Sequence, residues 1–219
     1  MNRTQQQVFR RIAAAAFLLL SFSLLVLPLK AEEPSSRTLD SDWQFRAIAS
    51  TDTTIDKEKA GVKQWHPAQV PGVVQTDLLR NQLIPDPFDR DNEFRLQWIG
   101  LTDWEYQTVF QVDAASLAHD HLDLAFDGLD TFADVYLNDQ PILHADNMFR
   151  HWRIPAKALL KPGSNTLRVV FHSAVENMLP YVKSLPYVLP SISTHNYGNE
   201  EDIATAPYTR KAPYNYGWD

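Results

Sequence analysis

WEYQTVFQV, residues 104–112, alternates large apolar or β-branched side chains with mostly polar ones over nine positions. Successive side chains of a β-strand point to opposite faces, so a period of two predicts a half-buried strand. The face predicted to be buried holds Trp104, Tyr106, Thr108, Phe110 and Val112.

The same alternation recurs along the chain, between short segments typical of turns. Apolar residues alternate with others in 122–127, 133–137 and 167–171, and turn-forming residues fill 138–141 and 161–165. Short strands at close spacing with few helical patterns are typical of an antiparallel sandwich. The sequence therefore predicts an all-β domain, and it contains no internal repeat.

The residues before this region predict smaller elements. Trp43 and Phe45 are two apart and share one face of a short strand. Residues 65–72 read as a strand followed by a Pro-Gly turn, and residues 76–83 as a short helix that ends before Pro85. The apolar face of that helix is predicted to hold Leu78, Leu79 and Leu83.

The alternating pattern ends at His172. A helix over residues 173–178 is possible, but Pro180, Pro186 and Pro190 are predicted to interrupt it. We expect residues 173–219 to form a long irregular excursion over the edge of the sandwich, and such segments are often functional.

Composition limits the possible functions. A net charge of −7 without a cluster of Lys or Arg argues against binding of nucleic acid. The chain has no cysteine, which excludes disulfides, a thiolate nucleophile and a zinc site with cysteine ligands.

The first 31 residues have the pattern of a signal peptide. Arg3, Arg10 and Arg11 precede an apolar stretch over 12–29, and Ala31 is a plausible cleavage point. The alternative is an uncleaved membrane anchor, because this stretch approaches the minimum length for spanning a bilayer. Cleavage would release residues 32–219 as a periplasmic or secreted domain that makes no membrane contact.

The last twelve residues, YTRKAPYNYGWD (208–219), combine four aromatic side chains with Arg210, Lys211 and Asp219. Ring faces stack on the C–H faces of a sugar, and charged groups bind its hydroxyls. A core aromatic cluster with cations on its rim is the alternative.

Other candidate sites have weaker support. DPFDRDNE (86–93) resembles a calcium loop faintly but lacks the glycine and the final bidentate glutamate. His119 and His121 have no third ligand at a spacing suitable for zinc. No pair of carboxylates can be chosen for hydrolysis without geometry. The residues alone predict a sugar-directed sandwich of unknown activity, without a metal or cofactor.

Five stretches in one order carry a resemblance to a known family. They are DPFDRDNE (86–93), QWIGLTDWEY (97–106), FDGLDTFADVYLND (126–139), ADNMFRHW (145–152) and YTRKAPYNYGWD (208–219). Together they resemble the N-terminal domain of β-mannosidases, in the clan that includes β-galactosidase and β-glucuronidase. The third stretch is common across the clan, and the last is the one that resembles mannosidases.

The resemblance implies a jelly-roll, galactose-binding-like domain, followed by further sandwich domains and a TIM barrel. It implies a retaining mechanism with two glutamates on the barrel about 5–5.5 Å apart, so no catalytic residue is expected in this chain. It further implies that Trp218 forms part of the wall of a mannose pocket and that Asp219 accepts hydrogen bonds from sugar hydroxyls. Core packing is the alternative for Trp218. Weaker candidates for the rim of the same pocket are Asp91, Asn92 and Glu93.

Three further residues are expected to have structural roles. Arg210 is expected to pair with nearby carboxylates, and Asp130 and Asn138 to hold turns through hydrogen bonds from their side chains to the backbone.

The leading hypothesis is that the chain is the front portion of an exo-β-mannosidase, inactive without the barrel. Its partners would be a β-mannoside and the barrel of the same protein. The alternative is a free-standing carbohydrate-binding module, and a sandwich that only supports a neighbouring domain is a third possibility.

Overall fold

The structure, a computed structural model, describes residues 35–48, 60–187, 189 and 204–212. The chain divides into two units, 1–38 and 39–219, and the following description concerns the second. The predicted signal peptide and the predicted site residues Trp218 and Asp219 lie outside the described residues. Within the described ranges, no helix is long and apolar enough to cross a membrane.

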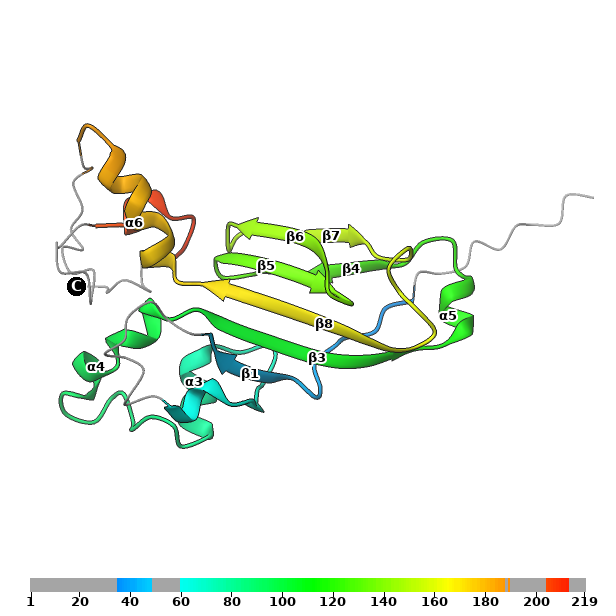
Figure 1. Cartoon of the computed structure of the whole chain (residues 1–219), viewed down its shortest axis with the longest axis horizontal. Coiled ribbons are helices and arrows are strands. Elements are labelled where there is room, and N and C mark those ends of the chain that lie inside the picture. Colours follow the sequence, from blue (N-terminus) through cyan, green and yellow to red (C-terminus); the bar gives the residue numbers. More distant parts are fainter. Residues whose placement is uncertain (1–34, 49–59, 188, 190–203, 213–219) are drawn as a thin grey trace, which may run out of the picture. The chain divides into compact units, whose positions relative to one another are not determined.

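A six-stranded sheet with the order β2-β1-β3-β8-β5-β6 forms the body of this unit, and a separate pair, β4-β7, accompanies it (Figure 1). All pairings between these strands are antiparallel, which confirms the predicted architecture. The strands are β1 (Gln44–Ala47), β2 (His66–Pro67), β3 (Trp104–Val112), β4 (Asp123–Phe126), β5 (Phe132–Leu137), β6 (Gln140–Asp146), β7 (Trp152–Pro155) and β8 (Gly163–His172).

Short helices fill the connections between the strands. The α-helices are α3 (Val74–Arg80), α4 (Asn92–Arg95), α5 (Ala114–Ala118) and α6 (Ala174–Ser184), and the 3-10 helices are η1 (Ala60–Lys63), η2 (Gln97–Leu101) and η3 (Ala206–Tyr208). Helix α4 begins at the end of the segment 86–93 that faintly resembles a calcium loop, and η2 follows it.

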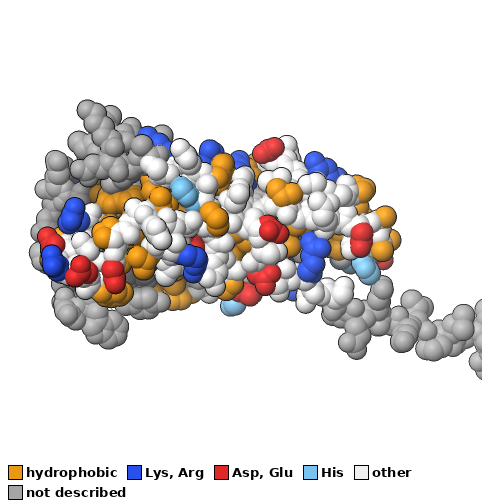
Figure 2. Space-filling view, turned by 90° about the horizontal axis from the view of Figure 1, so that it is seen from below, with side chains coloured by type: hydrophobic (Ala, Val, Ile, Leu, Met, Phe, Trp, Pro, Cys, Tyr) orange, Lys and Arg blue, Asp and Glu red, His pale blue; other side chains and the backbone are white. Residues whose placement is uncertain are grey.

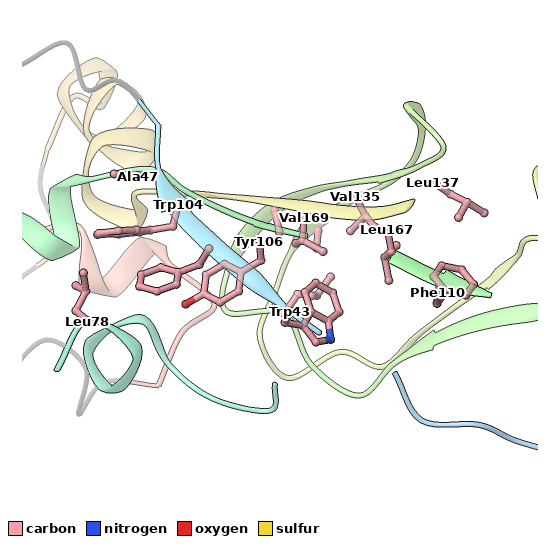
Figure 3. Close-up of a cluster of buried hydrophobic side chains, with 14 of the residues drawn as sticks. Trp43, Ala47, Leu78, Trp104, Tyr106, Phe110, Val135, Leu137, Leu167 and Val169 are labelled. Atoms are coloured by element: carbon pink, nitrogen blue, oxygen red, sulfur yellow. The ribbon is translucent and has the colours of Figure 1, made fainter. Parts of the chain in front are cut away.

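The core lies on one face of the large sheet and follows from the alternation in β3. Tyr106 pairs with Phe45 of β1 and with Val169 of β8, so the apolar sets of three strands share one face (Figure 3). The rings of Phe45 and Tyr106 are stacked with centroids 5.6 Å apart. Each large side chain buried in this way contributes about 1.5–3 kcal/mol to stability.

The hairpin between β5 and β6 is tighter than predicted. Its two central residues, Asn138 and Asp139, have φ values of 50° and 65°, as a type I′ turn requires, and β6 already begins at Gln140. The Asn138 side chain accepts a hydrogen bond from the backbone N–H of Thr166 at 3.0 Å and donates to the carbonyl of Leu159 at 2.9 Å. Asn138 therefore ties the turn to neighbouring segments.

Two helical predictions need correction. Helix α3 spans 74–80 instead of 76–83, and Leu78 is buried while Leu79 is exposed, so its apolar stripe is narrower than predicted. Helix α6 continues through Pro180 to Ser184. Pro180 lies on the exposed side of the helix, where water can hydrogen-bond the backbone carbonyl that a proline leaves unpaired.

Candidate functional site

Of the residues predicted to form the rim of a sugar pocket, the structure describes three. Asn92 is the first residue of α4, and its buried side chain donates a hydrogen bond to the carbonyl of Asp86 at 2.8 Å. Asp91 and Glu93 on either side are exposed. Asn92 thus holds its own loop together, whereas the two carboxylates remain available to a ligand.

The described part of the C-terminal aromatic tract lies against the turn that follows β6. Asn147 and Arg210 form a parallel β-bridge, and the N–H of Met148 donates to the carbonyl of Arg210 at 3.0 Å. Lys211 forms an ion pair with Asp130 at 2.5 Å. Segment 204–212 is therefore fixed to two loops at the same end of the sheet.

These contacts concern two residues with predicted structural roles, Arg210 and Asp130. In the described part of the chain, Arg210 contributes its backbone to the bridge, and the neighbouring cation Lys211 pairs with a carboxylate. The carboxylate of Asp130, predicted to hold a turn, accepts from the hydroxyl of Thr131 and from Lys211. Asp130 thus helps to anchor the C-terminal segment.

A hollow of about 220 Å³ lies between α6, the residues after it and η3. The ring of Tyr181 meets that of Tyr208 edge-on, with centroids 6.1 Å apart, and the hydroxyl of Tyr208 accepts from the N–H of Leu189 at 2.6 Å. This aromatic hollow can receive an apolar ligand surface, such as the C–H face of a sugar. Its lining residues are Tyr181, Leu185, Pro186, Tyr187, Leu189 and Tyr208.

The sequence prediction included Tyr208 but missed Tyr181 and Tyr187. Both follow prolines, Pro180 and Pro186, in a stretch that was read only as a helix interruption. The repeated Pro-Tyr pair was the available signal for this hollow.

A polar network near the start of α6 was also missed. His172, the last residue of β8, has Nδ1 3.0 Å from Asp103 Oδ2 and Nε2 3.0 Å from Asp134 Oδ2. Ionised carboxylates only accept hydrogen bonds, so this arrangement favours a proton on both ring nitrogens, which is the imidazolium form of His172. Asp134 also accepts from Nδ1 of His144 at 2.7 Å. We call these four residues the His172 network.

Contacts within this network shift the pKa values of two of its members, His172 and Asp134. Burial alone would lower the pKa of His172, but hydrogen bonds to Asp134 and Asp103 and their negative charges outweigh it and raise that pKa. The hydrogen bond from His144, with the contacts to His172, outweighs partial burial and lowers the pKa of Asp134.

The network positions the helix that carries the aromatic hollow. The other oxygen of Asp103 accepts from the N–H of Ser173 at 2.7 Å. The Ser173 hydroxyl donates to the carbonyl of Gly100 in η2 at 2.7 Å and caps α6 by accepting from the N–H of Glu176.

Two further carboxylates are buried, and cations bind both. Asp77 accepts from the N–H of Gln69 at 3.0 Å, from Arg80 at 2.9 Å and from the hydroxyl of Tyr106 at 3.1 Å. Burial, the charge of Asp77 and this hydrogen bond raise the pKa of Tyr106, so its phenol stays protonated.

Glu105 lies on the sheet face opposite the core. It pairs with Arg46 at 2.6 Å and with Arg168 at 3.2 Å. Like Asp77, Glu105 is engaged in structural contacts, so we do not assign it a proton-transfer role.

Among the described residues, no group of three or more His, Cys, Asp or Glu side chains is arranged to hold a metal ion. The described residues also offer groups that suit binding, namely aromatic ring faces in the hollow and exposed carboxylates at Asp91 and Glu93.

Comparisons with known proteins agree on one family. The family described as "Glycosyl hydrolase 2 galactose-binding domain-like" matches residues 43–219. β-Mannosidase B of Thermothelomyces thermophilus is 36% identical over 181 residues, which are 83% of this chain and 19% of that protein. The Aspergillus fumigatus β-mannosidase B is 36% identical over 183 residues, 83% of this chain and 20% of that protein.

A solved structure shows the same fold. The crystal structure of the β-D-mannosidase from Dictyoglomus thermophilum superposes with a TM-score of 0.70 at 36% identity, over 83% of this chain and 20% of that chain. The chain thus spans about a fifth of the length of the relatives it matches.

Proposed function

Because the chain belongs to the glycosyl hydrolase 2 galactose-binding domain-like family, we propose that it is the N-terminal portion of a β-mannosidase. The observation that carries the proposal is that β-mannosidases are similar to the chain both in sequence and in fold. The β-mannosidases named above share 36% identity with the chain, and the solved one has a TM-score of 0.70.

The complete protein would be an exo-acting retaining enzyme that removes terminal β-D-mannose from the non-reducing end of glycans. Its two catalytic glutamates would lie about 5–5.5 Å apart on a barrel that follows this domain. In this proposal Trp218 and Asp219 form one wall of the mannose pocket, and the exposed carboxylates of Asp91 and Glu93 lie near its rim. The signal-like pattern of residues 1–31 supports a periplasmic or secreted location.

The test compares two proteins from the same gene, the 219-residue chain and the complete protein. We expect the complete protein to hydrolyse an aryl β-mannoside and the 219-residue chain to show only background release of the aryl group. An aryl β-glucuronide serves as the control substrate. Turnover by the 219-residue chain well above background would contradict the assignment of catalysis to the barrel.

The aromatic hollow favours one second candidate, a carbohydrate-binding module that functions without a catalytic domain. In that case the 219-residue chain would bind manno-oligosaccharides in calorimetry, and Tyr187→Ala would weaken the binding. If calorimetry detects no heat of binding when manno-oligosaccharides are added to the wild type or to the variant, this alternative is excluded.

A further inference from the structure

Aromatic side chains dominate the exposed apolar surface of the described residues. The structure has nine exposed large hydrophobic side chains there, and five of them are aromatic. A contiguous exposed apolar patch on a protein marks an interaction site more often than singly scattered residues do. The five are Phe88 (97% exposed), Phe94 (69%), Phe149 (63%), Tyr181 (54%) and Tyr187 (71%).

The topology brings these five residues to one end of the six-stranded sheet. Trp104 begins β3 and pairs with Phe171 near the end of β8, and Phe132 begins β5 and pairs with Asp146, the last residue of β6. The loop with Phe88 and Phe94 precedes β3, the turn with Phe149 follows β6, and α6 follows β8. We call this surface the aromatic end; Figure 1 shows α4 and α6 there.

The aromatic end is held in place by local hydrogen bonds. The carboxylate of Asp86 accepts from the N–H of Phe88 at 3.0 Å, while its carbonyl accepts from the buried side chain of Asn92. The side chain of Asn147 accepts from the N–H of Phe149 at 3.0 Å. These loops therefore present phenyl rings to the exterior in a defined backbone conformation, as a preformed interface does.

We propose that the aromatic end is a docking surface for the polypeptide that follows residue 219 in the complete protein. Exposed aromatic side chains are typical of the anchor residues of protein interfaces. Figure 2 shows apolar side chains interspersed with charged ones on one face of the described residues. The inference rests on the proposed function for the existence of a longer chain, and it does not depend on the substrate.

Two observations favour this partner. The matched relatives are about five times as long as the region they share with this chain, so most of each relative's polypeptide lies outside that region. Segment 204–212 runs beside the turn that carries Phe149, because Arg210 bridges Asn147 and its carbonyl accepts from Met148. The last described segment of the chain therefore lies beside the aromatic end.

The three phenylalanines of this surface suit an apolar occupant. Phe88, Phe94 and Phe149 have no polar side-chain atom that could bind a hydroxyl group. Their rings can therefore pack against the apolar side chains of another protein surface.

Hydrogen-exchange mass spectrometry tests the proposal by comparing the same peptides in the 219-residue chain and in the complete protein. We expect amides in 86–95 and 147–150 to exchange at least about tenfold more slowly in the complete protein. The control is α5, which follows β3 at the opposite end of the sheet and should exchange equally in both proteins.

Variants make the test specific to the aromatic side chains. The double variant Phe88→Ser with Phe94→Ser should abolish the extra protection in the complete protein and leave the melting temperature of the 219-residue chain nearly unchanged, because both side chains are exposed in it. Val109→Thr, at a position 51% exposed in the middle of β3, is the matched control and should keep the protection.

Several results would overturn the proposal. They are equal exchange in the two proteins, a dimer of the 219-residue chain that requires Phe88 and Phe94, protection of the chain by mannotriose alone, and a gene that codes for nothing beyond Asp219. Hydrolysis of an aryl β-mannoside is measured on the same preparation. Protection without hydrolysis would refute the proposed function and support the docking surface.

Discussion

Replacing His172 with glutamine should destabilise the domain in a pH-dependent way. Glutamine can donate a hydrogen bond to only one of the two carboxylates that His172 bridges, and its own oxygen would face the other. A hydrogen bond to a charged group contributes about 1.5–3 kcal/mol at most. The side chains of Asp103 and Asp134 are 37% and 32% exposed, so water compensates part of the loss. We therefore expect a cost of about 1–2 kcal/mol at pH 6.

The sign of the pH effect follows from the raised pKa of His172. A raised folded-state pKa adds stability that is fully present below the unfolded value, about 6.5, and is lost as the pH rises through the folded value. The difference between wild type and His172→Gln should thus be largest below pH 6.5 and shrink at alkaline pH.

Thermal unfolding followed by circular dichroism between pH 5.5 and 9 measures this difference. At about 2–4 °C per kcal/mol, the expected loss in melting temperature at pH 6 is about 2–8 °C. His151→Gln is the control, because His151 is exposed and lies 3.7 Å from Asp127, which is also exposed. An effect of His172→Gln that stays the same at every pH would refute the imidazolium bridge.

Three further perturbations have defined outcomes. Asp77→Ala leaves the N–H of Gln69 and the hydroxyl of Tyr106 without their acceptor. We expect urea unfolding to show that it lowers the free energy of unfolding by about 3–5 kcal/mol. The double variant Asp77→Ala with Tyr106→Phe should lose less stability than the two single variants do in sum. Strictly additive losses would contradict a stabilising contact between Asp77 and Tyr106. Asn138→Ala places alanine at a φ of 50° and removes three hydrogen bonds, so we expect calorimetry to show a loss of about 2 kcal/mol or more in the free energy of unfolding. Asn138→Gly should recover only the part of this loss that comes from backbone strain. In the complete protein, Asp219→Ala should lower kcat/KM for an aryl β-mannoside about tenfold to over a hundredfold, and an unchanged value would exclude direct contact with the substrate.

The strands could be predicted because their signal is local. The alternation in 104–112 determined both the bounds of β3 and its buried face, since half the residues of a half-buried strand must contact the core. The turn residues around Asn138 and Gly163 likewise separated the strands of the sheet, although one turn proved shorter than expected.

The polar site features could not be predicted because they depend on residues distant in sequence. His172 and Asp103 are 69 positions apart, and only the pairing of β3 with β8 brings them together. The predicted helix is shorter than α6 because the destabilisation caused by Pro180 depends on its surroundings. Proline leaves one backbone carbonyl unpaired, and a sequence pattern does not show whether that carbonyl faces water.

The arrangement around Glu105 has a consequence for the evolution of this domain. One buried carboxylate forms ion pairs with the guanidinium groups of both Arg46 and Arg168 on neighbouring strands. Replacing Glu105 alone would leave two arginines that repel each other. Replacing one arginine would leave the buried carboxylate of Glu105 with a single cation to offset its loss of hydration. Homologous sequences should therefore change these three positions together, so that their covariation records the order of strands β1, β3 and β8 in the sheet.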